Sequence, residues 1–125
     1  MIFGIGTDIV DVSRMKKWVD SGFLIERFFN KKECKDFKSV SKACEYYANR
    51  FAAKEAFSKA LGTGLSGFDL KDVFVLNDEN GRPFVVLENS AEKIFKKMCG
   101  NSKIHISLSN EKQFAVAYVI IESEN

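Results

Sequence analysis

The stretch "NRFAAKEAFSKALGTG", residues 49–64, constrains the fold more than any other, because it predicts a long helix rich in alanine. We expect this helix to cover about residues 42–61 and to end at Gly62, which stands where a helix stops. At about 100° per residue its apolar positions gather on one side. They are Ala53, Ala56, Phe57, Ala60 and Leu61. Alanines on this face let another element of the chain pack close to the helix.

The other side of this helix carries Phe51, Glu55 and Lys59, each one turn from the next. A Glu and a Lys four residues apart commonly form an exposed ion pair, which stabilises a helix by only about 0.5 kcal/mol. The glycine-rich loop "GTGLSG" follows directly, and its backbone N–H groups are suited to an anion. Gly62 can equally be no more than the helix cap, so the sequence alone leaves a surface ion pair and a binding site open.

The first strand is predicted over residues 2–7. Strand alternation puts Gly4, Gly6 and then Asp8 on one side of it, and Phe3, Ile5 and Ile9 on the other. Two glycines beside a carboxylate leave room for a close approach from outside.

Capping and turn signals predict the elements that follow. Ser13 is expected to cap a first helix that runs to about Phe29, and a shorter helix is expected to begin near Asn30. The polar turn "NDENGR" between "VFVL" and "PFVVLE" predicts a hairpin, and residues 90–98 are expected to be helical.

Two strands complete the chain, "KIHISLS" and "QFAVAYVIIE", joined by the short loop "NEK". In the first, Ile104, Ile106 and Leu108 point one way, while His105, Ser107 and Ser109 point the other. The last strand is apolar on both faces, which predicts a central strand covered on each side. The whole pattern predicts one α+β domain over residues 1–125, a mainly antiparallel sheet packed with one long and several shorter helices.

The composition, 46% hydrophobic and 29% charged residues, is that of a soluble globular chain. No apolar run is long enough to span a bilayer, and the opening "MIFGIGTDIV" has neither a basic region nor a cleavage site. The three cysteines, Cys34, Cys44 and Cys99, lack metal-ligand spacing, so reduced thiols are expected and a Cys-type zinc site is not. These features favour a cytoplasmic protein without a membrane partner.

Positive charge is concentrated in residues 13–42, where nine Lys/Arg stand against four Asp/Glu. The formal net charge of the chain is only +2. Such asymmetry indicates a surface that meets something acidic, although a solvated pair of helices would have the same composition.

Four segments together resemble one family. They are "GIGTDIVDVSR", "RFAAKEAFSKALGTG", the hairpin "NDENGRPF" and the strand opening "HISLS". In this order and spacing they closely resemble the holo-acyl-carrier-protein synthases, which are small single-domain 4′-phosphopantetheinyl transferases. The resemblance covers nearly the whole chain, and its two long motifs are specific. The chain departs from many relatives at Asn110, where those have His or Asp, and in "MKKWVDSGFLIER", which is poorer in arginine.

The resemblance implies transfer of a phosphopantetheine arm from coenzyme A to a serine of an acyl carrier protein, releasing adenosine 3′,5′-bisphosphate. Such a step requires neutralisation of charge on the phosphates, and Mg²⁺, with Mn²⁺ as a substitute, provides it. Asp8 and Glu55 match the family's metal-binding carboxylates, and Lys59 matches its lysine beside the phosphates. The general base is either Glu55 or a water on the metal.

The resemblance also implies contacts with the nucleotide and with the protein substrate. Nucleotide contacts are expected from Arg50, Phe51, His105 and the backbone of Gly62, Thr63 and Gly64. A lone strand histidine is as often structural, so both roles of His105 stay open. Carrier-protein contacts are expected from Arg14, Lys17 and Arg27. The bacterial short members of the family support fatty acid biosynthesis and are homotrimers with active sites between subunits, and we expect the same here.

Two other classes of function compete with this interpretation. A small nucleic-acid-binding module would use the basic segment 13–42 and the twelve phenylalanines, but most of those lie in apolar patterns typical of a core. A metal-dependent phosphate hydrolase would use the same two carboxylates with water as the acceptor. The first alternative leaves Asp8 and Glu55 without a role, so nucleic acid is not expected as a partner.

Overall fold

A computed structural model of the chain describes residues 1–124. In chain order its elements are β1 (Ile2–Asp11), η1 (Val12–Met15), α1 (Lys16–Ser21), α2 (Phe23–Phe28), α3 (Val40–Leu61), η2 (Leu70–Asp72), β2 (Val73–Asn77), β3 (Pro83–Leu87), α4 (Asn89–Cys99), β4 (Lys103–Asn110) and β5 (Phe114–Glu122), where η marks a 3₁₀ helix. Helices and antiparallel strands are mixed along the chain, which is the α+β fold that the sequence predicts.

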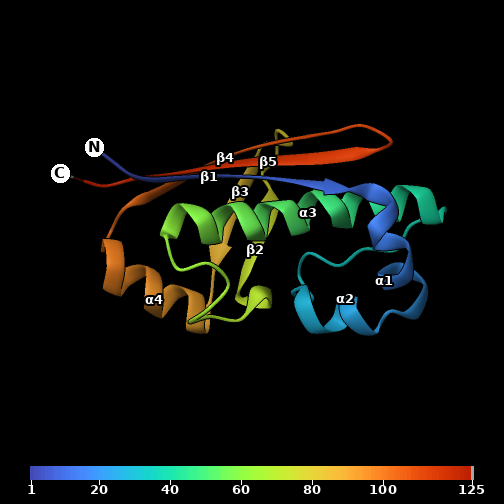
Figure 1. Cartoon of the computed structure of the whole chain (residues 1–125), viewed down its shortest axis with the longest axis horizontal. Coiled ribbons are helices and arrows are strands. Elements are labelled where there is room, and N and C mark those ends of the chain that lie inside the picture. The colour runs from blue at the N-terminus through green and yellow to red at the C-terminus, as the bar shows by residue number, and fades with distance from the viewer. Residues whose placement is uncertain (125) are drawn as a thin grey trace.

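The strands form two antiparallel sheets. Strand β5 lies between β1 and β4 in a three-stranded sheet, while β2 and β3 form a separate hairpin. In the larger sheet Asp8 pairs with Ala117, and Ala117 pairs with Leu108 on its other side. Figure 1 shows α3 running along one face of this sheet, with α1, α2 and α4 beyond it. The long helix is therefore the middle layer.

Helix α3 is buried around most of its circumference, and 15 of its 22 residues are buried. It begins after Ser39, whose side chain accepts the N–H of Lys42, and ends at Gly62, so the predicted span is confirmed. The predicted division into two faces is too simple, because η1 and α1 cover much of the other side. Phe51 is only 5% exposed and packs edge-on against Trp18.

The prediction of one helix from Ser13 to Phe29 is wrong. Asp11, not Ser13, starts the segment, because its carboxylate accepts the backbone N–H of Ser13 at 3.0 Å. Gly22 then adopts φ 72° and separates α1 from α2, since a left-handed residue ends a helix. The helix expected near Asn30 is only a hydrogen-bonded turn over residues 31–33.

The last strand, β5, is central as predicted but is covered on one face only. Ala115, Ala117, Val119 and Ile121 are buried against α3, whereas Tyr118 is 57% exposed and Ile120 38% exposed. On β1 beside them, Ile5 is 69% exposed and Ile9 62% exposed. We call this outward apolar surface of β1 and β5 the outer sheet face. The expectation of two covered faces therefore fails for a single chain.

No helix within residues 1–124 combines the length and the apolar character needed to cross a membrane. The three cysteines are free thiols in the part of the chain that the structure describes, as expected.

Candidate active site

The inward face of β1 lies directly against the backbone of α3. A methyl group at Gly6 would lie 2.0 Å from the carbonyl oxygen of Ala56, and one at Gly4 would lie 1.9 Å from that of Ala60. The room predicted beside Asp8 is thus filled by the chain's own helix, not by a molecule from outside. Because Asp8 is two positions after Gly6, the same close approach brings its carboxylate to the surface of α3.

Lys59 joins the strand to the helix. Its ammonium donates to the carbonyl oxygen of Thr7 at 3.0 Å and lies 3.4 Å from Asp8 Oδ1. Within residues 1–124 no ion pair links Lys59 to Glu55. The surface pair suggested by their spacing is therefore absent, and Lys59 is held by β1 instead.

Glu55 is half-buried and lies close enough to Asp8 and Lys59 for their charges to act on it. Burial raises the pKa of Glu55, and the negative charge of Asp8 raises it further, while Lys59 and Arg14 lower it. A half-buried carboxylate beside a second carboxylate favours a bound cation, because a cation would stabilise the charged form of Glu55.

The donor set at this point suits a metal that is shared with a substrate. Asp8 and Glu55 supply carboxylate oxygens, but nowhere in the described chain do three or more His, Cys, Asp or Glu side chains gather as a metal site. Mg²⁺ is usually bound by one or two carboxylates, substrate phosphate oxygens and water. The two carboxylates therefore fit Mg²⁺ better than they fit a metal enclosed by protein ligands alone.

The glycine-rich loop begins as a helix cap. Gly62 adopts φ 90° and donates its N–H to the carbonyl of Ser58 at 3.0 Å, so this N–H is not free for a phosphate. Thr63 and Gly64 lie beyond the cap, and Gly64 is exposed with φ 63°. Of the predicted anion-binding backbone, Thr63 and Gly64 remain suited to that role.

Arg50 and Phe51 are both buried within the single chain. The Arg50 guanidinium is buried, lies 4.3 Å from the ring centroid of Tyr46 and donates to Asn77 Oδ1 at 2.7 Å, which fixes the β2–β3 hairpin. Phe51 is part of the core, and Arg14 lies over its ring at 5.5 Å. Phe51 precedes Glu55 by one turn on the same side of α3. The nucleotide contacts expected from Arg50 and Phe51 stay predictions.

His105 lies on the opposite face of the sheet from Asp8. It belongs to the exposed positions of β4, and its Nε2 is 2.9 Å from Glu122 Oε1. The hydrogen bond from His105 is the main cause that lowers the pKa of Glu122. A cavity of about 220 Å³ lies beside His105, lined by Arg82, Pro83 and Phe84 of the hairpin end. The sequence analysis did not assign Arg82 a role, although its motif lies in the hairpin that carries the family resemblance.

The residues predicted to contact a carrier protein form an exposed basic surface. Arg14 belongs to η1, Lys17 to α1 and Arg27 to α2, and all three are exposed. Trp18, Phe28 and Phe29 pack together beneath them. Arg14 is close enough to Glu55 to lower its pKa, so one edge of this surface reaches the carboxylate pair.

Two buried charges, Lys54 and Glu33, were not among the predicted functional residues. Lys54 lies three or four positions from Phe51, Phe57 and Ser58 on α3, all of them buried. That spacing is the signal that could have revealed a buried lysine.

Comparisons with known proteins identify the family of this chain. The sequence profile of the 4′-phosphopantetheinyl transferase superfamily matches residues 4–119. The holo-[acyl-carrier-protein] synthase of Treponema denticola is 53% identical over 123 residues, which cover 98% of this chain and 99% of that protein. The crystal structure of the Bacillus anthracis synthase in complex with CoA (3′,5′-ADP) is 36% identical, with a TM-score of 0.79 and 99% of each chain covered. The Plasmodium yoelii acyl carrier protein synthase with ADP bound is 35% identical, with a TM-score of 0.86, and covers 100% of this chain and 98% of its own.

The chain therefore belongs to the 4′-phosphopantetheinyl transferase superfamily. Within that superfamily its whole length matches the holo-[acyl-carrier-protein] synthases, so it is a phosphopantetheinyl transferase enzyme.

Proposed function

We propose that this enzyme transfers 4′-phosphopantetheine from coenzyme A to a serine of an apo acyl carrier protein, releases adenosine 3′,5′-bisphosphate and supports fatty acid biosynthesis. The observation that carries the proposal is the meeting of Asp8, Glu55 and Lys59 where β1 packs on α3. Residues 1–125 act as one transferase domain, and the free thiols suit the cytoplasm.

Asp8 and Glu55 would hold Mg²⁺, or Mn²⁺ in its place, together with oxygens of the pyrophosphate. The bound cation would supply neutralisation of the charge that develops on the phosphates. Lys59 would add a second positive charge, because its ammonium lies beside Asp8 and its side chain is 54% exposed. The serine nucleophile comes from the carrier protein, and Glu55 or a neighbouring water would accept its proton.

We propose further that the active enzyme is a homotrimer with its sites between subunits. The outer sheet face supports this, because large apolar side chains on a monomer's surface commonly mark an interface. His105 supports it too, since it lies on the sheet face away from Asp8 and would complete a site only on a neighbouring chain. One subunit would supply Asp8 and Glu55, and its neighbour would help to form the coenzyme A pocket.

The basic surface of Arg14, Lys17 and Arg27 would receive the acidic carrier protein. Arg14 links this surface to the chemistry, because it lies over Phe51, one turn of α3 before Glu55. A carrier bound there would present its serine beside the carboxylate pair. The nucleic-acid alternative has less support, because Trp18, Phe28, Phe29 and Phe51 pack against one another instead of offering free ring faces.

The test is substitution of Glu55→Gln, which keeps the side chain's shape and removes its charge. If Glu55 were only a surface residue, stability would change by about 0.5 kcal/mol and transfer would persist. As a metal ligand its loss should lower transfer by orders of magnitude, because charge neutralisation by a cation contributes several kcal/mol. Asp8→Asn should behave alike, and the double variant should be scarcely worse than either single one. Glu92→Gln on α4 is the matched control, since Glu92 is exposed and remote from the site.

The assay is mass spectrometry of an apo carrier protein after incubation with coenzyme A and Mg²⁺. The expected product is a carrier heavier by one phosphopantetheine, formed by the native chain and by Glu92→Gln. Coenzyme A cleaved without carrier modification would favour the hydrolase, and an unmodified carrier with tight DNA or RNA binding would favour the nucleic-acid module. Near-normal transfer by a folded Glu55→Gln variant at limiting Mg²⁺ would contradict the metal assignment.

A further inference from the structure

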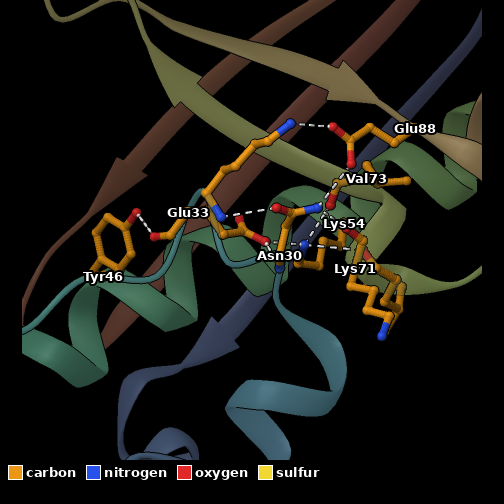
Figure 2. Close-up of polar contacts among 9 residues, drawn as sticks. Asn30, Glu33, Tyr46, Lys54, Lys71, Val73 and Glu88 are labelled. Carbon is orange, nitrogen blue, oxygen red and sulfur yellow. Dashed lines mark hydrogen bonds and ion pairs between the residues drawn. The ribbon is translucent and has the colours of Figure 1, made fainter.

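A buried ion pair joins α3 to the loop that follows α2 (Figure 2). The side chains of Lys54 and Glu33 are 1% and 0% exposed. Lys54 Nζ donates to Glu33 Oε2 at 2.5 Å, to the carbonyl of Leu70 at 3.1 Å and to that of Val73 at 2.5 Å. All three N–H groups of the ammonium are therefore used, one on the loop after α2 and two on the segment that leads into β2.

The loop is also held from its other sides. Glu33 Oε2 accepts the backbone N–H of Asn30 at 3.0 Å, and the Tyr46 hydroxyl donates to the carbonyl of Glu33. The Asn30 side chain donates to the carbonyl of Lys71 at 3.0 Å and to Glu88 Oε1 at 3.3 Å. The turn after α2 is thus fixed to α3 and to the segment that leads into β2.

The buried pair of Lys54 and Glu33 is not explained by its contribution to the stability of the fold alone. Burial lowers the pKa of Lys54 and raises the pKa of Glu33, so each charged form depends on the other. Replacing a buried ion pair with apolar side chains of similar volume often leaves a protein equally stable or more stable. What such a pair supplies is a fixed geometry, because three hydrogen bonds from one ammonium allow little sliding.

The segments that meet at Lys54 are those that carry the proposed active site. Lys54 immediately precedes Glu55 on α3. The loop containing Glu33 follows directly from α2 and therefore fixes one end of the basic surface with Arg27. Leu70 and Val73 follow the loop that contains Gly64. One ammonium therefore links the carboxylate helix, the basic surface and the end of the glycine-rich segment.

We propose that Lys54, paired with Glu33, is a positioning residue that sets the placement of the carrier-binding surface relative to Glu55. This inference rests on the proposed function. Transfer requires the serine oxygen to reach the phosphorus within a narrow range of distance, and a misplacement of about 1 Å costs about a hundredfold in rate. Lys54 itself touches neither substrate, because its ammonium is enclosed by chain atoms.

The test replaces both charges at once, as Lys54→Met with Glu33→Met. This double variant removes the three hydrogen bonds and leaves no unpaired buried charge, but the carbonyls of Leu70 and Val73 lose their donor. We therefore expect it to fold with a lowered Tm, and its kinetics are measured well below that Tm. We expect kcat to fall at least about tenfold and the KM for carrier protein to rise, with the KM for coenzyme A changed less than about twofold. The control is Lys96→Gln with Glu92→Gln, a pair 3.7 Å apart on the surface of α4, which should leave all three constants unchanged.

A second variant keeps the inference testable if the double variant does not fold. Asn30→Ala removes the bonds to Lys71 and Glu88 and leaves Lys54 and Glu33 in place. Asn30→Ala should also raise the KM for carrier protein, by a smaller factor than the double variant, and leave the KM for coenzyme A unchanged. Normal kcat and carrier KM in the folded double variant would overturn the inference, and so would an equal loss toward both substrates in either variant. A native chain that leaves the carrier unmodified would overturn the proposed function itself, which keeps the two failures distinguishable.

Discussion

Substitution of Gly6→Ala tests whether the contact between β1 and α3 builds the site. The added methyl would lie 2.0 Å from the carbonyl oxygen of Ala56 and 2.7 Å from the backbone nitrogen of Ala60. Both are backbone atoms inside a buried helix and cannot rotate away. The strand and the helix must therefore separate by at least about 1 Å to restore even a tight contact.

The separation of β1 from α3 determines how much the free energy of unfolding falls. Overpacking of a core costs about 1–3 kcal/mol, and a clash with backbone belongs at the upper end. Alanine recovers about 0.5 kcal/mol relative to glycine in a strand, which leaves a net loss of about 2–3 kcal/mol. At about 4 °C for each kcal/mol, the Tm should fall by about 10 °C. Because Asp8 moves with the strand, transfer should fall by about a hundredfold.

The assay pairs thermal melting with carrier modification, at one protomer concentration because assembly affects the Tm. Thr7→Ala is the matched control: it lies on the same strand, faces outward and should cost less than about 1 kcal/mol. A Gly6→Ala chain that melts within 2 °C of the native one, roughly the experimental error, and transfers normally would refute the reasoning. It would mean that β1 and α3 can move apart without disturbing the carboxylate pair.

Three further predictions concern the surface and the core. Reversing the charges of Arg14 and Lys17, by substitution with Glu, should raise the KM for carrier protein and weaken the dependence of that KM on salt, while coenzyme A binding is retained. An equal loss toward both substrates would contradict a docking role. Ile5 lies on the outer sheet face, and Ile5→Glu should reduce the mass measured by light scattering from three protomers to one and abolish activity. The reason is that burying an unpaired carboxylate in an interface is too costly. An Ile5→Glu chain that remains an active trimer would show that this face is not the interface. Burial raises the pKa of Tyr47 to about 12, so the free energy of unfolding should fall between about pH 10, where the unfolded phenol ionises, and pH 12. Tyr47→Phe should remove that part of the alkaline loss seen in denaturant titrations, and an unchanged slope would show that Tyr47 does not contribute to it.

Local signals in the sequence predicted the elements whose ends are marked by turns or caps. The end of α3 at Gly62 is confirmed where the sequence predicted it, and the hairpin is confirmed because a polar turn separates two apolar runs. The break at Gly22 was missed, since a single glycine within a helical pattern is compatible with either a helix or its end.

The site was predictable only in part, because its contacts depend on which elements meet. Spacing on one helix suggested a pair between Glu55 and Lys59, but the close approach of β1 offers Lys59 the carboxylate of Asp8 instead. The burial of Lys54 likewise depends on a loop far from it in the chain. The last strand was predicted to be covered on both faces, but its outer face is exposed in the single chain. Periodicity indicates which residues are apolar, and it does not show which element packs on them.

The pairing of β1 with β5 has a consequence for how the molecule is made. These strands lie at opposite ends of the described chain, yet they pair from Ile2 and Glu122 to Asp11 and Phe114. On a ribosome β1 and α3 emerge early, but their central partner emerges last, so the sheet cannot close until synthesis is nearly complete. Contacts between such distant segments also slow folding. The newly made chain must therefore keep one face of α3 uncovered by β5 for about half of its synthesis, and we expect chaperones to bind it during that interval.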